Sequence, residues 1–411
     1  MRTTIKGGYL TEHGPNSIML NDTRIAKLLE QLDLNDRIIK ADHSSAKRFI
    51  IKDGKPIAMP YSVKSTFFNK ILTLPTLLRV AREPFIRKHK KLDKQSFADF
   101  VRHRLGKTML NYAAGPFVNG IYAGDPEKLL FKLAFPRMYE VAKKKRSIIL
   151  TALKKPTPNP NKLKEKTIIS FQNGMQELPD AFGRILRGSG CQILTKVSNS
   201  KLERNQEGWK YSYSQANETH QQNFDEVIIT VPSHKLDAVQ LPSDINLEHT
   251  KAIYHPPVSS LLLGYKRSDV THPLDGFGML ASLPEKTDIL GALFTSTLFP
   301  IRNRAPQGHV AINVMLGGAR NPEIVEQSEE ELIATAHREI SKNLGISNEP
   351  VFHKLTKWKQ AIPQVSLNHQ NVLDELAQIE KDNPGLKFAG NYRRGISVGD
   401  CLINGMSLAI S

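Results

Sequence analysis

The stretch FAGNYRRGISVGDCLIN, from Phe388 to Asn404, decides how this 411-residue chain folds. An apolar run ends at Gly390, a loop with Gly395 and Gly399 follows, and an amphipathic run closes the stretch. This pattern predicts a strand, a glycine turn and a helix. The first amides of such a helix lack partners, and glycine lets a flat ligand or a phosphate approach the backbone. The same pattern is also typical of an ordinary connection between a strand and a helix.

The composition is that of a globular protein with room for two or three cores, since 40% of the residues are apolar and 24% are charged. The net charge of +17 favours an anionic partner, which means nucleic acid, an acidic membrane surface or a small polyanion. The chain has no zinc-finger spacing and no basic stripe interleaved with aromatic residues. Nucleic acid is therefore the least favoured of the three.

The two cysteines, Cys191 and Cys401, provide neither a disulfide framework nor a metal cluster, which fits a reducing compartment. No apolar run approaches the roughly 20 residues of a spanning helix, and no signal-peptide pattern is present. We expect a cytoplasmic protein, either free or attached peripherally to the cytoplasmic membrane, with no metal site.

The stretch from Phe388 to Asn404 resembles the carboxy-terminal flavin motif of the oxygen-dependent protoporphyrinogen oxidases, a branch of the flavin amine oxidase superfamily. The matching positions are Gly390, Gly395, Ile396, Val398, Asp400 and Cys401. In that family the segment closes over the isoalloxazine and ribityl parts of FAD. The resemblance therefore implies FAD as cofactor and places the following residues against it: Asn391, Gly395, Ile396, Ser397 and Val398.

A second match lies at the amino terminus, where Tyr9–Glu12 is typical of a short strand and Gly14–Ser17 of a turn. The resemblance implies that the turn residues Gly14, Pro15, Asn16 and Ser17 bind the cofactor. The family places a strand, a G-x-G-x-x-G turn and a helix before this segment, which takes roughly 30 residues. No G-x-G-x-x-G occurs in this sequence. We expect that the chain begins inside the first nucleotide-binding unit, through a late start codon or a true truncation, and that FAD binding is weakened.

The residues from about Phe67 to Ala152 are helical in pattern and strongly basic, with aromatic and aliphatic residues at helical spacing. Two interpretations stay open, a solvated helical face with a core stripe and contact with anionic lipid headgroups. Two sequence motifs that resemble those of the protoporphyrinogen oxidases, FxxFVxxRLG and PFVNGIYAGDPEKL, occur here at Phe97–Gly106 and Pro116–Leu129. A proline-rich linker is expected at Lys154–Lys166.

A hairpin is predicted around Asp53–Gly54, and Lys64 follows it. The resemblance places Lys64 where family members pair a basic residue with a tetrapyrrole propionate. An exposed surface lysine is the alternative. Further along, a helix is predicted after Ser170 and a strand at Cys191–Val197. The resemblance puts Val197 at the adenine end of FAD and Trp358, in the word WKQAIPQ, beside the isoalloxazine ring.

Short apolar segments between Leu261 and Val314, separated by turns, predict an antiparallel sheet. The resemblance implies that this sheet forms the floor of a large apolar cavity over the flavin. By that resemblance the macrocycle pocket is lined by Phe277, Gly278, Leu280, Leu293 and Met315. For the leucines and Met315, a place in an ordinary core is the alternative.

The fold class that follows is α/β combined with α+β: an amine oxidase type, Rossmann-like FAD-binding domain without its amino-terminal part, an antiparallel-sheet substrate domain and a helical insertion. We expect the FAD-binding domain at residues 1–35, 166–235 and 380–411. We expect the substrate domain at 36–64 and 236–379, and the basic, membrane-associating domain at 65–165.

Signatures of nucleophilic, metal-dependent or paired-carboxylate catalysis are absent from the sequence, so we assign no side chain a catalytic role. A flavoenzyme fits this absence, because the cofactor carries the chemistry. The resemblance implies oxidation of protoporphyrinogen or coproporphyrinogen to the porphyrin in haem biosynthesis, with dioxygen as acceptor and hydrogen peroxide as product. The alternative is a remnant without flavin that binds only porphyrin or membrane. An amine or carotenoid oxidase is disfavoured, nucleic acid is not expected as a partner, and a homodimer stays open.

Overall fold

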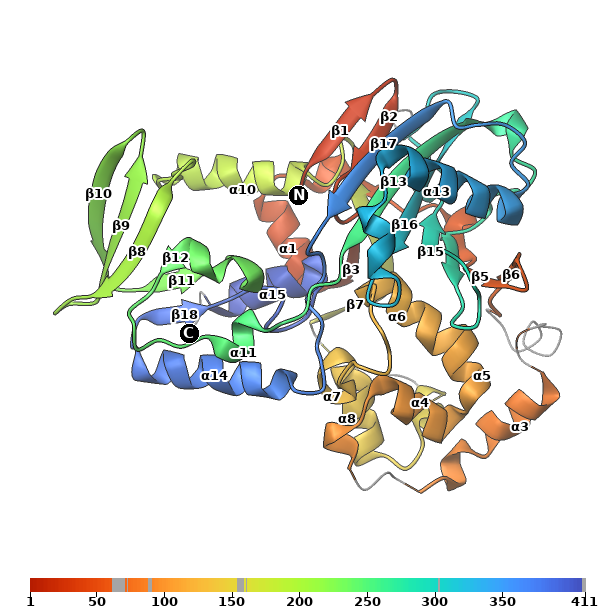
Figure 1. Ribbon diagram of the computed structural model, residues 1–411, viewed down its shortest axis with the longest axis horizontal. Helices are drawn as coiled ribbons and strands as arrows, with labels where there is room; N and C mark the ends of the chain where they lie inside the picture. The colour runs from red at the N-terminus through yellow and green to blue at the C-terminus, as the bar shows by residue number, and fades with distance from the viewer. Residues whose placement is uncertain are drawn as a thin grey trace. The chain divides into compact units, whose positions relative to one another are not determined.

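The computed structural model describes residues 1–60, 71, 73–87, 91–153, 159, 161–301 and 304–408 (Figure 1). Backbone proximity divides the chain into two compact units. Unit 1 contains residues 1–179 and 256–362, and unit 2 contains residues 180–255 and 363–411. The division into three domains made above stays a prediction.

Unit 1 begins with a hairpin of β1 (Thr3–Lys6) and β2 (Tyr9–Glu12). A three-stranded sheet follows, in the order β3 (Ile18–Asp22), β7 (Lys162–Phe171) and β4 (Ile38–Lys40). The spacing of apolar residues in Asp22–Asp33 predicts a helix with Asp22 as its cap. The structure confirms it as α1 (Thr23–Gln31), and the Asp22 carboxylate accepts the Arg24 amide at the N-cap. The predicted linker to Lys166 is too long, because β7 already begins at Lys162 and pairs with β3 there.

The largest element of unit 1 is a seven-stranded sheet. Its order is β17 (Phe352–Trp358), β13 (Val258–Lys266), β16 (His309–Gly317), β15 (Ile289–Leu293), β14 (Gly278–Ala281), β5 (Phe49–Lys52) and β6 (Lys55–Ala58). The predicted antiparallel sheet and the hairpin at Asp53–Gly54 are confirmed, with one exception: β5 and β14 pair in parallel.

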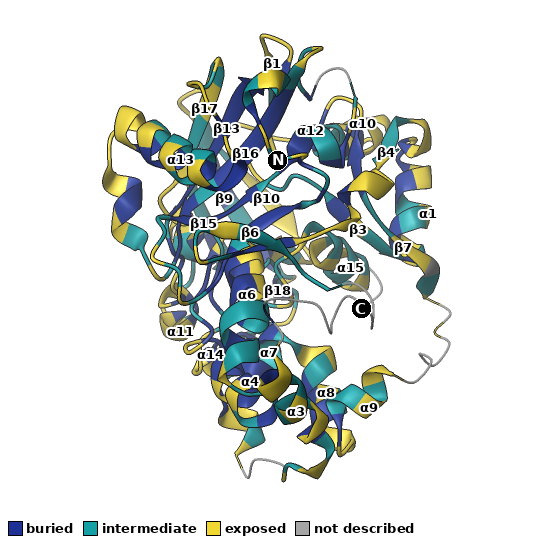
Figure 2. Ribbon diagram, turned by 90° about the vertical axis from the view of Figure 1, so that its right-hand side faces the viewer, coloured by how far each residue is buried: buried dark blue, intermediate teal, exposed yellow. Residues whose placement is uncertain are grey.

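One face of this sheet forms the main core of unit 1. Leu261, Val314 and Met279 point into it and pack with α13 (Glu329–Leu344), which contributes Leu332 and Ile340. Figure 1 shows α13 alongside β13 and β16, and Figure 2 shows how thoroughly these two strands are buried. A capping box begins α13, because Ser328 and Glu331 each bond the other's backbone amide.

The helical part of unit 1 confirms the helical pattern predicted for this region. Its helices are α3 (Leu74–Ala81), η3 (Glu83–Phe85), α4 (Phe97–Leu105), α5 (Lys107–Met109), η5 (Leu110–Ala114), α6 (Gly115–Tyr122), α7 (Phe131–Ala134), α8 (Pro136–Lys144) and α9 (Ile148–Ala152). Phe100 and Phe131 stack with ring centroids 3.8 Å apart in the core of this part. The face of α6 that carries Gly120 and Asn119 packs on β14.

The sheet of unit 2 has the order β10 (Glu218–Phe224), β9 (Trp209–Gln215), β8 (Ser198–Arg204) and β12 (Val239–Gln240). A separate parallel pair joins β11 (Val227–Ile229) to β18 (Leu386–Phe388). The helices are α10 (Glu177–Gly188), which begins in unit 1, α11 (Glu248–Lys251), α14 (His369–Asp382) and α15 (Val398–Leu408). Trp209, Leu376 and Phe388 are the centre of its core.

The prediction of a strand at Cys191–Val197 is wrong, because those residues are irregular and the strand begins at Ser198. Among the described residues no strand pairs with this segment, and Ile193 and Leu194 remain exposed. An apolar run without a neighbouring strand has no ladder to complete, so its pattern alone does not make it a strand.

Candidate functional site

The predicted cofactor turn Gly14–Ser17 lies in unit 1, between β2 and β3. The buried carboxylate of Glu12 anchors its beginning: Glu12 accepts hydrogen bonds from the Met175 amide at 2.9 Å and the Thr3 hydroxyl at 2.7 Å. The Arg304 guanidinium lies 3.6 Å away. Burial raises the pKa of Glu12, and these partners oppose the shift. Glu12, two residues before the turn, is therefore held in place by these bonds.

The turn itself is open. Gly14 is exposed, and a Cβ placed there would have no other atom within 4 Å. Trp358, at the end of β17, is 45% exposed and donates its indole N–H to the carbonyl oxygen of His13 at 2.7 Å. The structure thus brings two predicted cofactor elements, the turn and Trp358, next to each other within unit 1.

The carboxy-terminal motif lies in unit 2 and confirms the predicted strand, turn and helix, with β18 ending at Phe388 and α15 beginning at Val398. Gly395 has φ +77°, a conformation that residues with a Cβ rarely adopt, and a Cβ there would lie 2.7 Å from that of Asp400. Ser397 caps α15, because its hydroxyl accepts the Asp400 amide at 3.1 Å and donates to the Asp400 carboxylate at 2.6 Å.

The turn of this motif rests on buried groups. His369 of α14 hydrogen-bonds the carbonyl oxygen of Tyr392 at 2.7 Å, and both side chains are buried. Burial lowers the pKa of His369, an effect that the bond to Tyr392 opposes, and burial raises the pKa of Tyr392 to about 12. The guanidinium of Arg393 pairs with Glu380. Helix α14, which the sequence analysis did not identify, thus holds the predicted cofactor motif in place.

The remaining predicted cofactor residues also lie in unit 2. Val197 is half-buried in the irregular segment before β8, and Asn391, Ile396 and Val398 are half-buried in and beside the turn. The predicted cofactor residues therefore belong to two sets, one on each compact unit.

Each set suits a flavin. The amino-terminal end of the 11-residue α15 offers backbone amides and a positive end, beside a glycine with no side chain to obstruct a planar ring. The turn at Gly14 offers open backbone, and Trp358 offers an exposed indole. Backbone donors and flat apolar surface are what a dinucleotide with an aromatic ring system requires.

Four of the predicted substrate residues lie on the second face of the seven-stranded sheet, opposite the core with α13. Ser260, Met315, Gly291 and Leu280 are partners in one row across β13, β16, β15 and β14, and Leu262, Asn313, Leu293 and Gly278 form the next row. Since alternate residues of a strand share a face, both rows lie on the same side. Four of the predicted residues, Gly278, Leu280, Leu293 and Met315, are therefore neighbours, and the last three are half-buried.

A cation that the sequence analysis missed lies beside these rows. The guanidinium of Arg48 lies over the ring of Phe277, with the central carbon 4.8 Å from the ring centroid. One of its N–H groups donates to the Ala46 carbonyl at 2.8 Å, and partial burial lowers its pKa. Phe277 is itself held by backbone bonds to Lys47 and Phe294. The available sequence signal was the position of Arg48 just before the first strand of the hairpin predicted around Asp53–Gly54.

Lys64, the predicted propionate partner, lies outside the described residues. Among the residues that are described, no group of three or more histidine, cysteine or acidic side chains is placed to hold a metal ion. Nor is any helix in those ranges both long enough and apolar enough to cross a membrane.

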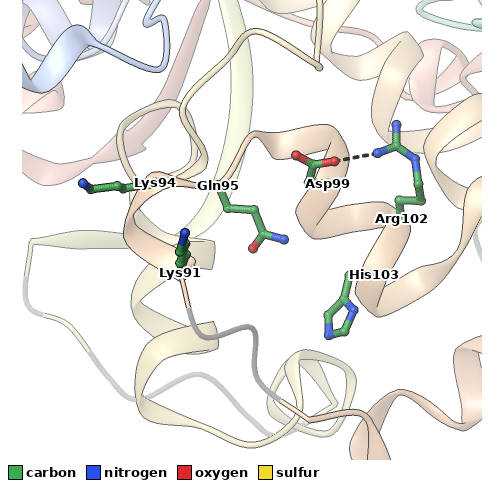
Figure 3. Close-up of a pocket in the computed structure, with 6 residues that line it drawn as sticks. All are labelled: Lys91, Lys94, Gln95, Asp99, Arg102 and His103. Carbon is green, nitrogen blue, oxygen red and sulfur yellow. Dashed lines mark hydrogen bonds and ion pairs between the residues drawn. The ribbon is translucent and has the colours of Figure 1, made fainter.

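A pocket of about 550 Å³ opens in the helical part of unit 1 (Figure 3). It is lined by Lys91, Lys94, Gln95, Asp99, Arg102 and His103. Figure 3 shows the two lysines on one side and Arg102 with His103 on the other, and Arg102 pairs with Asp99 at 2.7 Å. None of the predicted site residues belongs to this pocket, which is basic and faces solvent.

Comparisons with known proteins found matches over nearly the whole chain. Residues 1–409 match the family model described as flavin containing amine oxidoreductase. The mitochondrial protoporphyrinogen oxidase of Nicotiana tabacum is 28% identical, over 100% of this chain and 86% of that protein. The coproporphyrinogen III oxidase of Bacillus subtilis is 26% identical, over 98% of this chain and 87% of the relative. A solved structure from an Exiguobacterium species has a TM-score of 0.78 at 17% identity, covering 99% of this chain and 89% of that one.

Proposed function

Since the chain belongs to the family of flavin-containing amine oxidoreductases, we propose that it oxidises a porphyrinogen to the porphyrin with FAD as cofactor. Dioxygen is the electron acceptor and hydrogen peroxide the product, and the reaction belongs to haem biosynthesis. A remnant without flavin is not favoured, because the likeness to protoporphyrinogen and coproporphyrinogen oxidases extends over the whole chain.

The observation that carries this proposal is the pair of rows on the face of the seven-stranded sheet opposite α13, where α6 packs against Leu280. Leu280, Leu293 and Met315 offer a half-buried apolar surface, and Gly278 and Gly291 leave it flat. A flat apolar surface suits a macrocycle, because burial of its ring faces is favourable and needs no polar partner.

Arg48 gives this surface an anchor for carboxylates. Its guanidinium is held on the Phe277 ring, and a planar guanidinium can bond a carboxylate through two N–H groups at once. A porphyrinogen carries propionate side chains at the edge of an apolar ring. We propose that Arg48 holds one of them while Leu280, Leu293 and Met315 contact the ring.

FAD, when bound, accepts a hydride from a bridging methylene carbon and passes the electrons to dioxygen. The side chains of this protein bind and orient the ring and keep water from it, which aligns the reacting carbon, and the accompanying proton leaves to solvent. We propose that Gly14, Pro15, Asn16, Ser17 and Trp358 on unit 1 contact the cofactor. On unit 2 the contacts are made by Val197, Asn391, Gly395, Ile396, Ser397 and Val398.

The test is to purify the chain with added FAD, record flavin absorbance, and follow porphyrin fluorescence with each porphyrinogen in turn. We expect bound flavin, oxygen uptake and peroxide with protoporphyrinogen, coproporphyrinogen or both, and the ratio of the two kcat/KM values assigns the substrate. Protein that shows tight porphyrin binding but neither flavin nor turnover would support the remnant instead.

We further propose that the helical part of unit 1, within residues 65–165, contacts the cytoplasmic membrane surface. Seven large apolar side chains among its described residues are exposed, and the most exposed are Phe85 (77%) and Leu153 (78%). Two of the seven, Phe117 and Ile121, belong to α6. The other five form the exposed apolar set of the proposed membrane surface, which is Leu74, Leu78, Phe85, Leu150 and Leu153. The exposed cations of the same segments are Arg82, Arg87, Lys143, Lys144, Lys145 and Arg146.

These side chains belong together because a buried carboxylate joins their elements. Glu83 of η3 accepts the Arg104 guanidinium of α4, and also the Ser147 hydroxyl and the Ile148 amide at the start of α9. Phe85 and Leu150 therefore project from one rigid structure. Apolar side chains rimmed by cations are typical of attachment to anionic lipid surfaces.

Co-sedimentation with vesicles tests this attachment. We expect binding to vesicles with 30% anionic lipid at low salt, weaker binding to neutral vesicles, and loss in the variant Phe85→Ser/Leu153→Ser. The matched control Met19→Ser removes an exposed apolar side chain from β3, outside the helical part, and should bind as the wild type does. Equal sedimentation of all the variants would contradict the proposal.

A further inference from the structure

His13 lies where three segments of unit 1 meet. It follows β2 directly and precedes the turn Gly14–Ser17. Its ring nitrogens bond two threonine hydroxyls on different strands: Nε2 lies 2.7 Å from Oγ1 of Thr4 in β1, and Nδ1 lies 2.9 Å from Oγ1 of Thr356 in β17. The imidazole thus connects the hairpin to the edge strand of the seven-stranded sheet.

The backbone of the same residue is also engaged. The His13 amide donates to the Arg2 carbonyl at 3.0 Å, and its carbonyl accepts the indole N–H of Trp358 at 2.7 Å. Every hydrogen-bonding group of His13 therefore has a partner, and two of the four partners, Thr356 and Trp358, belong to the last three residues of β17.

This arrangement constrains both neighbours. Thr356 and Trp358 point to the same side of β17, because alternate residues of a strand share a face. The indole is thereby held against the first peptide of the turn, and the turn cannot shift without breaking the bonds to β17. Exposed turns and exposed tryptophans ordinarily sample several conformations, and here two bonds from one residue oppose that freedom.

We infer that His13 is a positioning residue that fixes the Gly14–Ser17 turn and the Trp358 indole as one preformed surface for the flavin. This inference rests on the proposed function, because it assigns that surface to the cofactor. Its consequence is that the affinity for FAD depends on a side chain that need not touch it, since a preformed surface loses less conformational freedom on binding.

The electrostatics favour a neutral imidazole in this role. Burial, together with the positive charges of Arg2 and Lys354, lowers the pKa of His13. A neutral ring has one donor and one acceptor nitrogen, and a threonine hydroxyl can serve either, so both tautomers satisfy the geometry. The connection therefore persists throughout the neutral pH range.

The experiment uses the full chain in three variants. His13→Phe keeps the ring volume and removes both ring hydrogen bonds, Thr356→Val removes one of them from the other side, and His13→Gln keeps a donor and an acceptor. His353→Phe is the matched control, because His353 is an exposed histidine of the same strand whose side chain lies on the other face. FAD affinity is measured by quenching of flavin fluorescence during titration.

A second readout does not depend on the flavin. The chain contains only two tryptophans, Trp209 and Trp358. Protein labelled with 5-fluorotryptophan therefore gives two fluorine resonances, and the variant Trp358→Phe assigns them. We expect His13→Phe to move the Trp358 resonance and leave that of Trp209 in place, and to raise the Kd for FAD roughly tenfold.

The other variants sharpen the result. Thr356→Val should also weaken FAD binding. The double variant with His13→Phe should bind FAD no more weakly than His13→Phe alone, because both substitutions remove the same bond between His13 and Thr356. His13→Gln should recover part of the affinity, and His353→Phe should match the wild type. Recovery by glutamine separates positioning from a loss of fold.

Two results would overturn the inference. An unmoved Trp358 resonance in His13→Phe means that the imidazole does not hold the indole. A moved resonance with unchanged FAD affinity means that the connection exists but does not prepare the flavin surface. A wild-type chain that takes up no flavin at all overturns the proposed function and the cofactor role of His13 together, and the fluorine spectrum then still decides whether His13 holds Trp358.

Discussion

Gly120 of α6 lies directly against Leu280 of β14: a Cβ on Gly120 would come within 2.9 Å of Leu280 Cδ2. The absence of a side chain at position 120 therefore sets the position of a predicted substrate residue. The neighbouring atom is the end of a flexible side chain, so an added methyl group would move Leu280 and leave the backbone in place.

We expect Gly120→Ala to alter substrate binding more than stability. Alanine favours the helix by about 1 kcal/mol over glycine, which offsets part of the cost of crowding Leu280. The KM for porphyrinogen should rise roughly threefold to tenfold with a smaller change in kcat. Gly405→Ala is the control: it also adds a methyl to a helix, has no atom within 4 Å, and should change stability alone. An unchanged KM in Gly120→Ala would remove Leu280 from the substrate surface.

Gly278 should tolerate no side chain. It has φ +153°, and a Cβ there would lie 2.2 Å from the Ala292 carbonyl oxygen on the paired strand. Because that atom is backbone, relief requires the strands to separate, and Gly278→Ala should lower the free energy of unfolding by about 3 kcal/mol. Urea unfolding measures this value. Gly14→Ala, in open space, should unfold as the wild type does.

Arg48→Leu tests the proposed carboxylate anchor. Loss of a charge-assisted bond to a propionate should raise KM for porphyrinogen roughly tenfold to thirtyfold, and Arg48→Lys should restore only part of it, because an ammonium lacks the planar fork. The decisive comparison is steady-state kinetics on a substrate ester without free carboxylates. The variant and the wild type should then have the same KM. Lys52→Leu, which removes a cation that lies over Tyr112 instead, is the charge control.

Arg104→Leu should destabilise the helical part of unit 1. Arg104 and Glu83 are 3% and 0% exposed, so removal of the cation leaves a buried carboxylate without its charge partner. The expected cost is about 3 to 5 kcal/mol. Glu83→Leu in the same chain should recover only part of it, because the Ser147 hydroxyl and the Ile148 amide then lose their acceptor. Thermal unfolding checks both values. Lys144→Leu, which breaks the exposed pair with Glu140, should cost less than about 1 kcal/mol.

His369 should contribute to the loss of stability in weak acid. Its pKa is lowered by burial, so the unfolded chain binds a proton at higher pH than the folded chain does. The stabilising effect of the neutral ring is complete above the unfolded pKa of about 6.5 and decreases as the pH falls below it, by at most about 1.4 kcal/mol per pH unit. Urea unfolding of His369→Gln between pH 7.5 and 5 should show a shallower decline than the wild type. Parallel curves would contradict this assignment.

Much of the local structure followed from the sequence alone. The glycine turn before α15, the cap of α1 at Asp22 and the hairpin at Asp53–Gly54 are short-range features, and the residues that form them are adjacent in the chain. The residues of Phe388–Asn404 indicated the family and its cofactor only through their resemblance to the flavin motif, because the glycine pattern by itself is also typical of an ordinary connection between a strand and a helix.

The tertiary structure alone decided what depends on pairing between distant segments. The row that joins Ser260, Met315 and Leu280 comes from strand register, and the place of Arg48 over Phe277 comes from the parallel pairing of β5 with β14. The bonds of His13 to Thr356 and Trp358 span more than 340 positions. The spacing of apolar residues in the sequence does not predict such contacts, because each depends on which strands become neighbours. The apolar run at Cys191–Val197 makes the same point, since it has strand composition but no strand beside it.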